Sequence, residues 1–167
     1  MAIEIERKFL VASDAWRAQA AGEGERYLQG YLAIGERSVV RVRIAGERRA
    51  WIGVKEHRIG RARGEYEYPI PVADARELLQ LVIGRLVEKN RYRVPHAGQV
   101  WELDEFLGAN AGLVVAEIEL AAAEEEFERP SWLGAEVTAE RAYYNAALAL
   151  HPWTEWENAE LRRNESE

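Results

Sequence analysis

The sequence has no cysteine among its 167 residues. Neither a disulfide framework nor a thiolate metal site can therefore form. Its three histidines, His57, His96 and His151, do not show the spacing of metal ligands. Any metal is then expected to be held by carboxylates, and oxygen ligands favour a hard cation such as Mg²⁺ or Mn²⁺ over zinc.

Long apolar runs are also missing. No segment approaches the ~20 apolar residues of a membrane-spanning helix, and the first ten residues, MAIEIERKFL, lack the basic and apolar parts of a secretory signal. We therefore expect a cytoplasmic protein with no membrane partner. Basic residues are in the minority, 22 against 29 acidic ones with a formal net charge of −7, which argues against a nucleic acid polymer as partner.

The length corresponds to about one domain, and no internal repeat is visible. Residues 155–167 are polar and charged, which is typical of a frayed or disordered end. We expect a single domain over residues 1–153 and a polar C-terminal tail over residues 154–167.

Three segments carry helix signals, namely a capping residue, an apolar face and a stop. The expected helices are 15–21 after Ser13, a segment that begins at the Asp74 and Glu77 capping box and stops at Gly84, and a last long helix between Thr138 and Pro152. Most of the remaining chain alternates charged residues with β-branched and aromatic ones between glycines and prolines, which predicts strands.

These expected strands share a charged face. Side chains on a strand alternate between its two sides, so residues two positions apart lie together. Acidic sets and basic sets mostly occupy separate strands, whereas a merely solvated sheet face would favour mixed charges. The aligned sets are Glu4, Glu6 and Lys8; Arg41 and Arg43; Glu65 and Glu67; Lys89, Arg91 and Arg93; Glu102 and Asp104; and Glu117 and Glu119.

A closed sheet can bring these charged faces together. If the charged face lines a lumen, the apolar face lies outside under helices, and no sheet edge stays exposed. Unpaired buried charge is costly, so the carboxylates in such a lumen need metal ions and the basic groups need an anion. A polyphosphate with bound metal satisfies both sets, and the same charges stabilise phosphoryl transfer.

The order of several short motifs also resembles a known family. Residues 4–8, EIERK, resemble the ExExK signature of the CYTH superfamily, the triphosphate tunnel metalloenzymes, which includes short bacterial inorganic triphosphatases. This motif is followed in order by QGYL at 29–32, RVR at 41–43, Lys55, EYE at 65–67, KNR at 89–91, WELDEF at 101–106, EIEL at 117–120 and SWLGAEVT at 131–138. The resemblance covers nearly the whole chain.

The resemblance implies an α+β, mainly β fold: a closed eight-stranded antiparallel β-barrel with helices packed outside and a triphosphate in its centre. It implies that Glu4, Glu6 and Glu119 hold Mg²⁺ or Mn²⁺, with Glu117 as a further ligand or a support through water. The residues implied to grip the phosphates are Lys8, Arg41, Arg43, Lys55, Lys89 and Arg91. Those implied to act in catalysis are Glu65, Glu67 and Asp104, which would organise the cations, the metal or the attacking water, together with Lys89 and Arg91.

One position departs from the family pattern. A hydroxyl residue commonly stands two positions before the tunnel lysine, and this chain has Gly53 there. The change removes a phosphate-binding hydroxyl, and a glycine within a strand is also typical of a bulge, which would turn Trp51 to the other face. The other tryptophans favour core positions, Trp101 in particular because it alternates with Glu102 and Asp104.

The function implied by the resemblance is a metal-dependent triphosphatase that hydrolyses inorganic tripolyphosphate, or a related triphosphate, to diphosphate and phosphate. Three alternatives stay open, because the same charges suit all of them: a thiamine or nucleoside triphosphatase, a class IV-like adenylyl cyclase, and a non-enzymatic polyphosphate-binding module. The short chain without an evident base-reading insert favours the hydrolase. A homodimer is also left open as the assembly.

Overall fold

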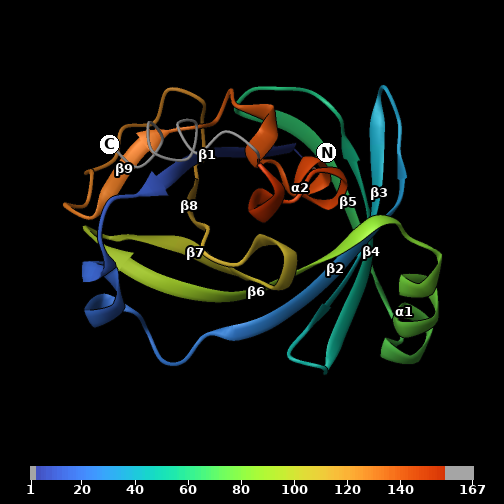
Figure 1. Ribbon diagram of the computed structural model, residues 1–167. Helices are drawn as coiled ribbons and strands as arrows, with labels where there is room; N and C mark the ends of the chain where they lie inside the picture. The colour runs from blue at the N-terminus through green and yellow to red at the C-terminus, as the bar shows by residue number, and fades with distance from the viewer. Residues whose placement is uncertain (1–2, 157–167) are drawn as a thin grey trace.

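Strands are the main elements of the computed structural model, which describes residues 3–156 (Figure 1). The strands are β1 (Ile3–Val11), β2 (Glu25–Ile34), β3 (Ser38–Ala45), β4 (Arg49–Glu56), β5 (Ala62–Ile70), β6 (Ile83–His96), β7 (Gln99–Leu107), β8 (Val114–Glu119) and β9 (Leu133–Glu136). The two α-helices are α1 (Val72–Leu78) and α2 (Asn145–Leu150). Short 3-10 helices are η1 (Asp14–Gln19), η2 (Leu79–Leu81), η3 (Gly108–Asn110), η4 (Arg141–Tyr143) and η5 (Trp153–Glu155).

Eight of the strands in residues 3–156 close into an antiparallel barrel. Their order is β5-β4-β3-β2-β6-β7-β8-β1, and β5 pairs with β1 to complete the ring. The closure uses only the start of β1, where Ile3, Glu4 and Ile5 pair with Gly64, Arg63 and Ala62. Farther along, the same side of β1 pairs with β9. The expected closed eight-stranded antiparallel barrel is confirmed.

The strand registers place the charged sets on the inner side of the barrel. Residues directly opposite in an antiparallel pair point to the same face, and Arg43 lies opposite Gln29 on one side and Trp51 on the other. The β3–β4 pairing runs without a register shift from Ser38 to Ala45. Gly53 therefore forms no bulge, and Lys55 keeps the inward face that its alternation predicts.

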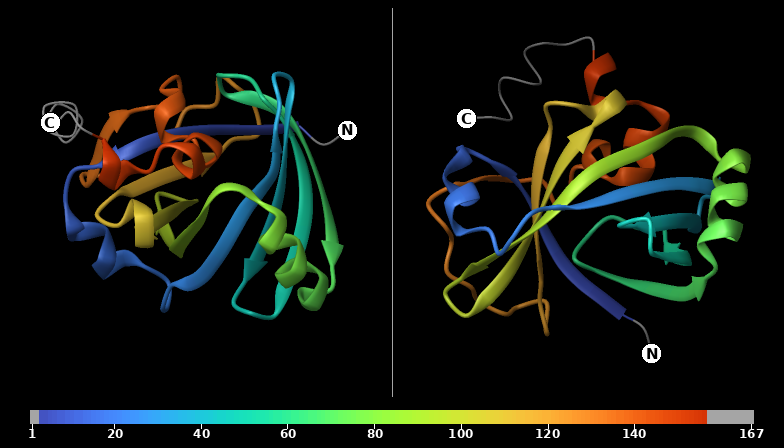
Figure 2. Two further views of the ribbon diagram at one scale, coloured as in Figure 1. Left: turned by 45° about the vertical axis from the view of Figure 1, so that its right-hand side comes forward. Right: turned by 90° about the horizontal axis from the view of Figure 1, so that it is seen from below.

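The outer face of the barrel is covered by apolar clusters in two places. Helix α1 and η2 cover the outer residues of β2, β3 and β4, with Val42, Ile44 and Leu79 in the contact (Figure 2). A second cluster joins Trp16 of η1 to Trp101 and Trp132, and all three indoles are fully buried. The prediction that Trp101 belongs to the core is confirmed.

The last helix lies elsewhere: it packs into one end of the barrel (Figure 1). Val87, Phe106 and Val115 share the inward parity of the charged residues on their strands, and they pack with Tyr143 and Leu148 in one buried cluster. This apolar filling closes one end of the lumen, so the charged part of the lumen is confined to the remaining length.

The helix boundaries differ from the expected ones. Ser13 does cap η1 by accepting a hydrogen bond from the Ala15 backbone N–H, but η1 is a 3-10 helix that ends at Gln19. Helix α1 begins at Val72 after Pro71 without a side-chain cap, so the expected start at Asp74 is wrong. Proline suits this position because its N–H is not needed there.

The expected long C-terminal helix is also wrong, because α2 has only six residues. Thr138 does not cap it; its hydroxyl accepts a hydrogen bond from the Lys8 backbone N–H at 3.0 Å. Trp156 is buried in the cluster around α2, so the packed chain reaches at least that residue, while residues 157–167 of the expected tail lie outside the described residues. No helix between residues 3 and 156 has the length and apolarity that a membrane crossing needs.

Candidate active site

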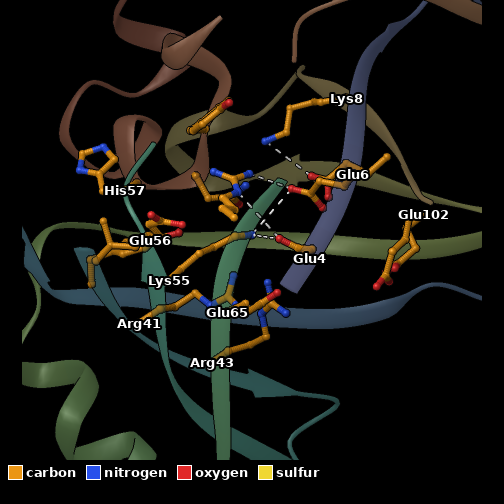
Figure 3. A pocket seen from close by; sticks show the side chains of 18 of the residues that line it. Glu4, Glu6, Lys8, Arg41, Arg43, Lys55, Glu56, His57, Glu65 and Glu102 are labelled. Atoms are coloured by element: carbon orange, nitrogen blue, oxygen red, sulfur yellow. Dashed lines mark hydrogen bonds and ion pairs between the residues drawn. The ribbon is translucent and has the colours of Figure 1, made fainter. Parts of the chain in front are cut away.

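The lumen is lined by charged side chains from β1, β3, β4, β5, β6, β7 and β8 (Figure 3). Two sides of it have opposite charge. The acidic wall consists of Glu4, Glu6, Glu117 and Glu119 on β1 and β8, and the basic wall consists of Arg41, Arg43, Lys89 and Arg91 on β3 and β6. The structure thus brings together the residues that the sequence predicted for metal and for phosphate, although they come from distant parts of the chain.

On the acidic wall, two glutamates face each other without a cation between them. Glu6 lies directly opposite Glu119 in the β1–β8 pairing. Burial and the charges of Glu4, Glu102 and Glu6 raise the pKa of the Glu119 carboxyl above its usual range. Like charges directly opposite are destabilising. A positive charge bound between these two carboxylates would therefore stabilise the wall.

Glu4 and Glu6 are nevertheless held by two basic side chains. Lys55 Nζ lies 2.5 Å from Glu4 Oε2 and 3.7 Å from Glu6 Oε1, as Figure 3 shows. Arg63 donates a hydrogen bond of 2.9 Å to Glu6 Oε1. Burial raises the pKa of the Glu6 carboxyl, but Lys55 and Lys8 outweigh burial and hold that pKa below its usual range. Glu6 therefore favours its ionised form.

Lys8 lies beside Glu117 at the deeper end of the charged lumen. Its Nζ is 3.6 Å from Glu117 Oε1 and donates a hydrogen bond of 3.4 Å to the backbone carbonyl of Tyr143. It also lies 4.8 Å from the ring centroid of Tyr144. The C-terminal segment, which follows β9, therefore fixes the position of this lysine.

On the basic wall, Arg41 and Arg43 differ in their partners. Arg41 donates hydrogen bonds to Glu67 at 2.6 Å and to Glu65 at 3.3 Å. Arg43 donates to the neutral Gln29 at 3.1 Å, and within residues 3–156 no carboxylate lies at ion-pair distance from it. Burial, Arg41 and Arg91 together lower the pKa of Arg43 to about 10. Arg43 is thus the guanidinium on this wall that most lacks an anion.

Two members of this wall, Lys89 and Arg91, form a buried network with Asp104 of β7. Asp104 accepts hydrogen bonds from Lys89 at 2.8 Å and from Arg91 at 2.7 and 2.9 Å. Burial raises the pKa of Asp104, but Arg91 and Lys89 outweigh it and bring that pKa to about 2. Burial, with Arg91 and Arg43 nearby, lowers the pKa of Lys89 to about 7 despite Asp104. Arg91 also pairs with Glu102 Oε2 at 2.8 Å, so carboxylates fix both cations of this network in place.

The predicted acidic residues Glu65, Glu67 and Asp104 therefore hold cations. Glu65 lines the lumen, whereas Glu67 and Asp104 do not and contact Arg41, Lys89 and Arg91 from the side or from behind. Arg93 is exposed and lies opposite Glu102 at the outer end of β6. Trp51 shares the inward face with Arg43, but Arg49 covers its ring at 5.2 Å.

Sequence reasoning missed several residues that line or support the lumen. Arg63 has the same parity as Glu65 and Glu67, so extending that strand by one step would have found it. Gln29 and Tyr31 are neutral and carry no charge signal. Tyr144 and Asn145 reach the lumen from the C-terminal segment, where strand alternation says nothing. Asn145 accepts hydrogen bonds from Lys89 at 3.0 Å and from Gln29 at 3.3 Å.

The donor set of the acidic wall fits a hard divalent cation. In the part of the chain that the structure describes, no three acidic or histidine groups converge closely enough to hold a metal ion, because Glu4 and Glu6 turn to Lys55 and Arg63. The four glutamates still offer all-oxygen coordination from adjacent strands, which is the chemistry of Mg²⁺ and Mn²⁺. Burial and the neighbouring glutamates raise the pKa of the Glu119 carboxyl, and a divalent cation would offset their repulsion.

The closed barrel and its oppositely charged walls define a class of protein. Comparison with known families identifies that class. The CYTH domain matches residues 2–148, and the chain belongs to that family. It is 42% identical over 154 residues to an inorganic triphosphatase of Acetivibrio thermocellus, with 92% of this chain and 97% of the relative covered. It is 37% identical over 155 residues to an inorganic triphosphatase of Nitrosomonas europaea, with 88% and 97% covered.

Solved structures agree with this family. The crystal structure of an inorganic triphosphatase matches with a TM-score of 0.64 and 35% identity, and the match covers 90% of this chain and 96% of that one. A protein from Pyrococcus horikoshii matches with a TM-score of 0.56 at 19% identity, over 72% of this chain and 81% of that one. The second likeness shows the fold alone.

Proposed function

We propose that this chain is a metal-dependent triphosphatase that hydrolyses inorganic tripolyphosphate to diphosphate and phosphate inside the barrel. The observation that carries the proposal is the lumen itself, in which an acidic wall on β1 and β8 faces a basic wall on β3 and β6. A triphosphate with a divalent cation complements both walls at once. The names of the two sequence relatives support the same substrate.

The basic wall would bind and orient the phosphates. Guanidinium groups hold phosphate oxygens with paired hydrogen bonds, and Arg43 lacks a carboxylate partner to compete with them. Arg41 is positioned by Glu65 and Glu67. Lys8 and Lys55 add point charges from β1 and β4. Together these cations would hold the chain of phosphates along the lumen.

Lys89 and Arg91 would stabilise the charge that develops during cleavage. Asp104 and Asn145 hold the Lys89 ammonium, and Asp104 and Glu102 hold the Arg91 guanidinium. Groups fixed in this way need no reorientation when charge builds up on the leaving oxygens, which is where electrostatic catalysis gains most. Asp104 would act as the positioning residue for both.

The acidic wall would hold the metal, with Glu4, Glu6 and Glu119 as ligands and Glu117 as a further ligand or a support through water. When bound, Mg²⁺ or Mn²⁺ supplies charge neutralisation and an activated water for attack on a terminal phosphorus. The role of the carboxylates is to fix that charge opposite the basic wall.

Substrate entry requires the ion pairs across the lumen to open. Lys55 reaches into the lumen to Glu4 and Glu6. This side chain must turn away from the glutamates when metal and phosphate arrive.

The test is a product assay on a panel of tripolyphosphate, thiamine triphosphate, ATP and GTP with Mg²⁺ or Mn²⁺. We expect phosphate and diphosphate release to be fastest with tripolyphosphate and to stop on exhaustive chelation. Cyclic AMP formed from ATP would favour the cyclase instead, and tight binding without product would favour a binding module. Full activity in the presence of chelator would contradict the metal part of the proposal.

The assembly and the cellular location stay predictions. A homodimer would be tested by light scattering of the purified chain, and a cytoplasmic location by cell fractionation.

A further inference from the structure

Arg63 is a buried cation beside the acidic wall, and the proposed hydrolysis gives it no role. It lies directly opposite Glu4 in the short β1–β5 pairing that closes the barrel. Its side chain is buried and donates to Glu6 Oε1 at 2.9 Å. It therefore reaches the acidic wall from the neighbouring strand β5.

The C-terminal segment holds Arg63 in this place. The guanidinium carbon lies 4.7 Å from the ring centroid of Tyr144, and an aromatic face attracts a desolvated cation. Lys8 lies over the same ring at 4.8 Å. Tyr144 itself is fixed, because its hydroxyl donates a hydrogen bond of 2.6 Å to the Thr138 carbonyl.

The contacts of Arg63 with the acidic wall are incomplete. Its Nε is buried, makes no hydrogen bond to any described residue and lies 3.9 Å from Glu4 Oε2, beyond hydrogen-bond length. Glu4 Oε2 is instead paired with Lys55 Nζ at 2.5 Å. A buried donor without a hydrogen bond is costly. The acidic wall therefore satisfies the Arg63 guanidinium only in part.

We propose that Arg63 is a built-in counter-cation of the acidic wall. It pairs with Glu6 when no metal is bound, and it competes there with the divalent metal. The proposal rests on the metal site assigned under the proposed function. Arg63 reduces the repulsion between Glu4 and Glu6 when no metal is present. The same contact lowers the affinity for metal, because the metal must displace a charge that is already in place.

Lys55 cannot fill this role alone. Its ammonium also pairs with Glu4 and Glu6, but it belongs to the phosphate-gripping set, so an entering triphosphate offers it a new partner. Arg63 is held by Tyr144 and by the barrel closure. It therefore remains at the acidic wall after Lys55 has turned to the phosphates, and its charge continues to oppose the metal.

The test is Mn²⁺ binding to the full chain without substrate, measured by calorimetry and by the electron paramagnetic resonance signal of free Mn²⁺. We expect Arg63→Met to bind Mn²⁺ on the order of tenfold more tightly than the unsubstituted protein, because a nearby positive charge is removed. The matched control is Arg26→Met. Arg26 pairs with Glu88 at 2.6 Å on the outer face, and its loss should leave Mn²⁺ affinity unchanged.

A second readout is the melting temperature in the presence of chelator. Arg63→Met should melt at a lower temperature than the unsubstituted protein, since Glu6 loses a buried partner, and Mn²⁺ should raise its melting temperature by more than it raises that of the unsubstituted protein. Equal or weaker Mn²⁺ binding by Arg63→Met would overturn the proposal and leave Arg63 as a support of the fold or of the metal ligands.

Two further outcomes are decisive. If Arg63→Met does not fold, Arg63→Lys decides instead: its shorter reach and smaller head should weaken the contact with Glu6 and tighten Mn²⁺ binding by a smaller factor, and unchanged or weaker binding would overturn the proposal. If neither the unsubstituted protein nor any variant binds Mn²⁺, the assigned metal site fails, and the role of Arg63 as its competitor fails with it.

Discussion

Glu6 and Glu119 lie directly opposite each other on β1 and β8, although both are acidic. Glu6 has basic neighbours in Arg63 and Lys55, whereas the charges that act on Glu119 are those of other glutamates, Glu4 and Glu102 foremost. Among the described residues, the charge of Glu6 is therefore compensated by basic side chains and that of Glu119 is not. This asymmetry separates the effects expected from substituting the two residues.

Glu119→Gln should stabilise the metal-free protein while lowering its activity. Removing one of two opposed charges relieves repulsion worth up to about 1 kcal/mol of unfolding free energy, and loss of a metal ligand should reduce turnover by at least about tenfold to 100-fold. Thermal melts in chelator and steady-state assays check both effects. Glu6→Gln is the matched control and should melt lower, because Arg63 and Lys55 lose the negative charge of their partner.

Tripolyphosphate should raise the melting temperature, and the rise should depend on Arg43. Any ligand that binds only the folded state stabilises it, by about 2.7 kcal/mol at a hundredfold excess over its dissociation constant. Because Arg43 lacks a carboxylate partner, Arg43→Gln should reduce this rise substantially and raise KM. Arg49→Gln removes a surface arginine that pairs with Glu25 and should leave the rise unchanged. A full rise in Arg43→Gln would show that this arginine does not contact the anion.

Gripping and catalytic cations should separate kinetically. Arg41→Gln should mainly raise KM, because uniform binding of ground state and transition state is lost. Lys89→Met should lower kcat by about 10²–10³-fold if its ammonium stabilises developing charge. Arg91 remains as a partner for Asp104 in that variant, so its melting temperature shows whether the fold is kept. If both variants change KM alone, the lumen is better described as a binding site.

Asp104 should make the protein sensitive to acid. Its pKa in the folded state is about 2 against an ordinary value of 3.8, so the folded state loses this proton more readily than the unfolded state does. The resulting stabilisation, roughly 2 kcal/mol, is fully present above pH 3.8 and is lost as the pH falls towards 2.

Unfolding free energies measured across this pH range check the prediction. Asp104→Asn should be less stable at neutral pH by about 3–5 kcal/mol, since Lys89 and Arg91 lose their carboxylate, and it should show a shallower acid dependence. Asp14→Asn, at an exposed position in η1, is the control and should keep the acid dependence of the unsubstituted protein.

The packing of α2 against β6 should depend on Gly84. This residue has a φ of 67°, and an added Cβ would lie 2.5 Å from the Ala149 carbonyl oxygen. Gly84→Ala should therefore cost both about 1–2 kcal/mol of backbone strain and about 1–3 kcal/mol of overpacking. Gly98→Ala isolates the first cost, because Gly98 has a φ of 80° with nothing near an added Cβ. Equal destabilisation in denaturant titrations of both variants would contradict the contact with α2.

The inner face of most strands could be predicted from the sequence. The period of two is a local property of the extended chain, so Arg41 with Arg43, and Glu117 with Glu119, fall on one side whatever their neighbours are. The helix boundaries were less predictable. Val72 begins α1 because Pro71 sets the backbone, and Thr138 serves β1 instead of a helix. A capping pattern competes with such tertiary contacts and can lose.

The sequence by itself determined the chemical content of this protein: no thiolate, an excess of carboxylates, and strands that keep their acidic and basic sets apart. Only the tertiary structure decided which set faces which. The β1–β5 closure brings Arg63 to Glu4 and Glu6 from nearly sixty residues away, and α2 brings Asn145 to Lys89. Pairing between distant segments depends on strand order and on the packing of the whole chain, which no local pattern of residues encodes.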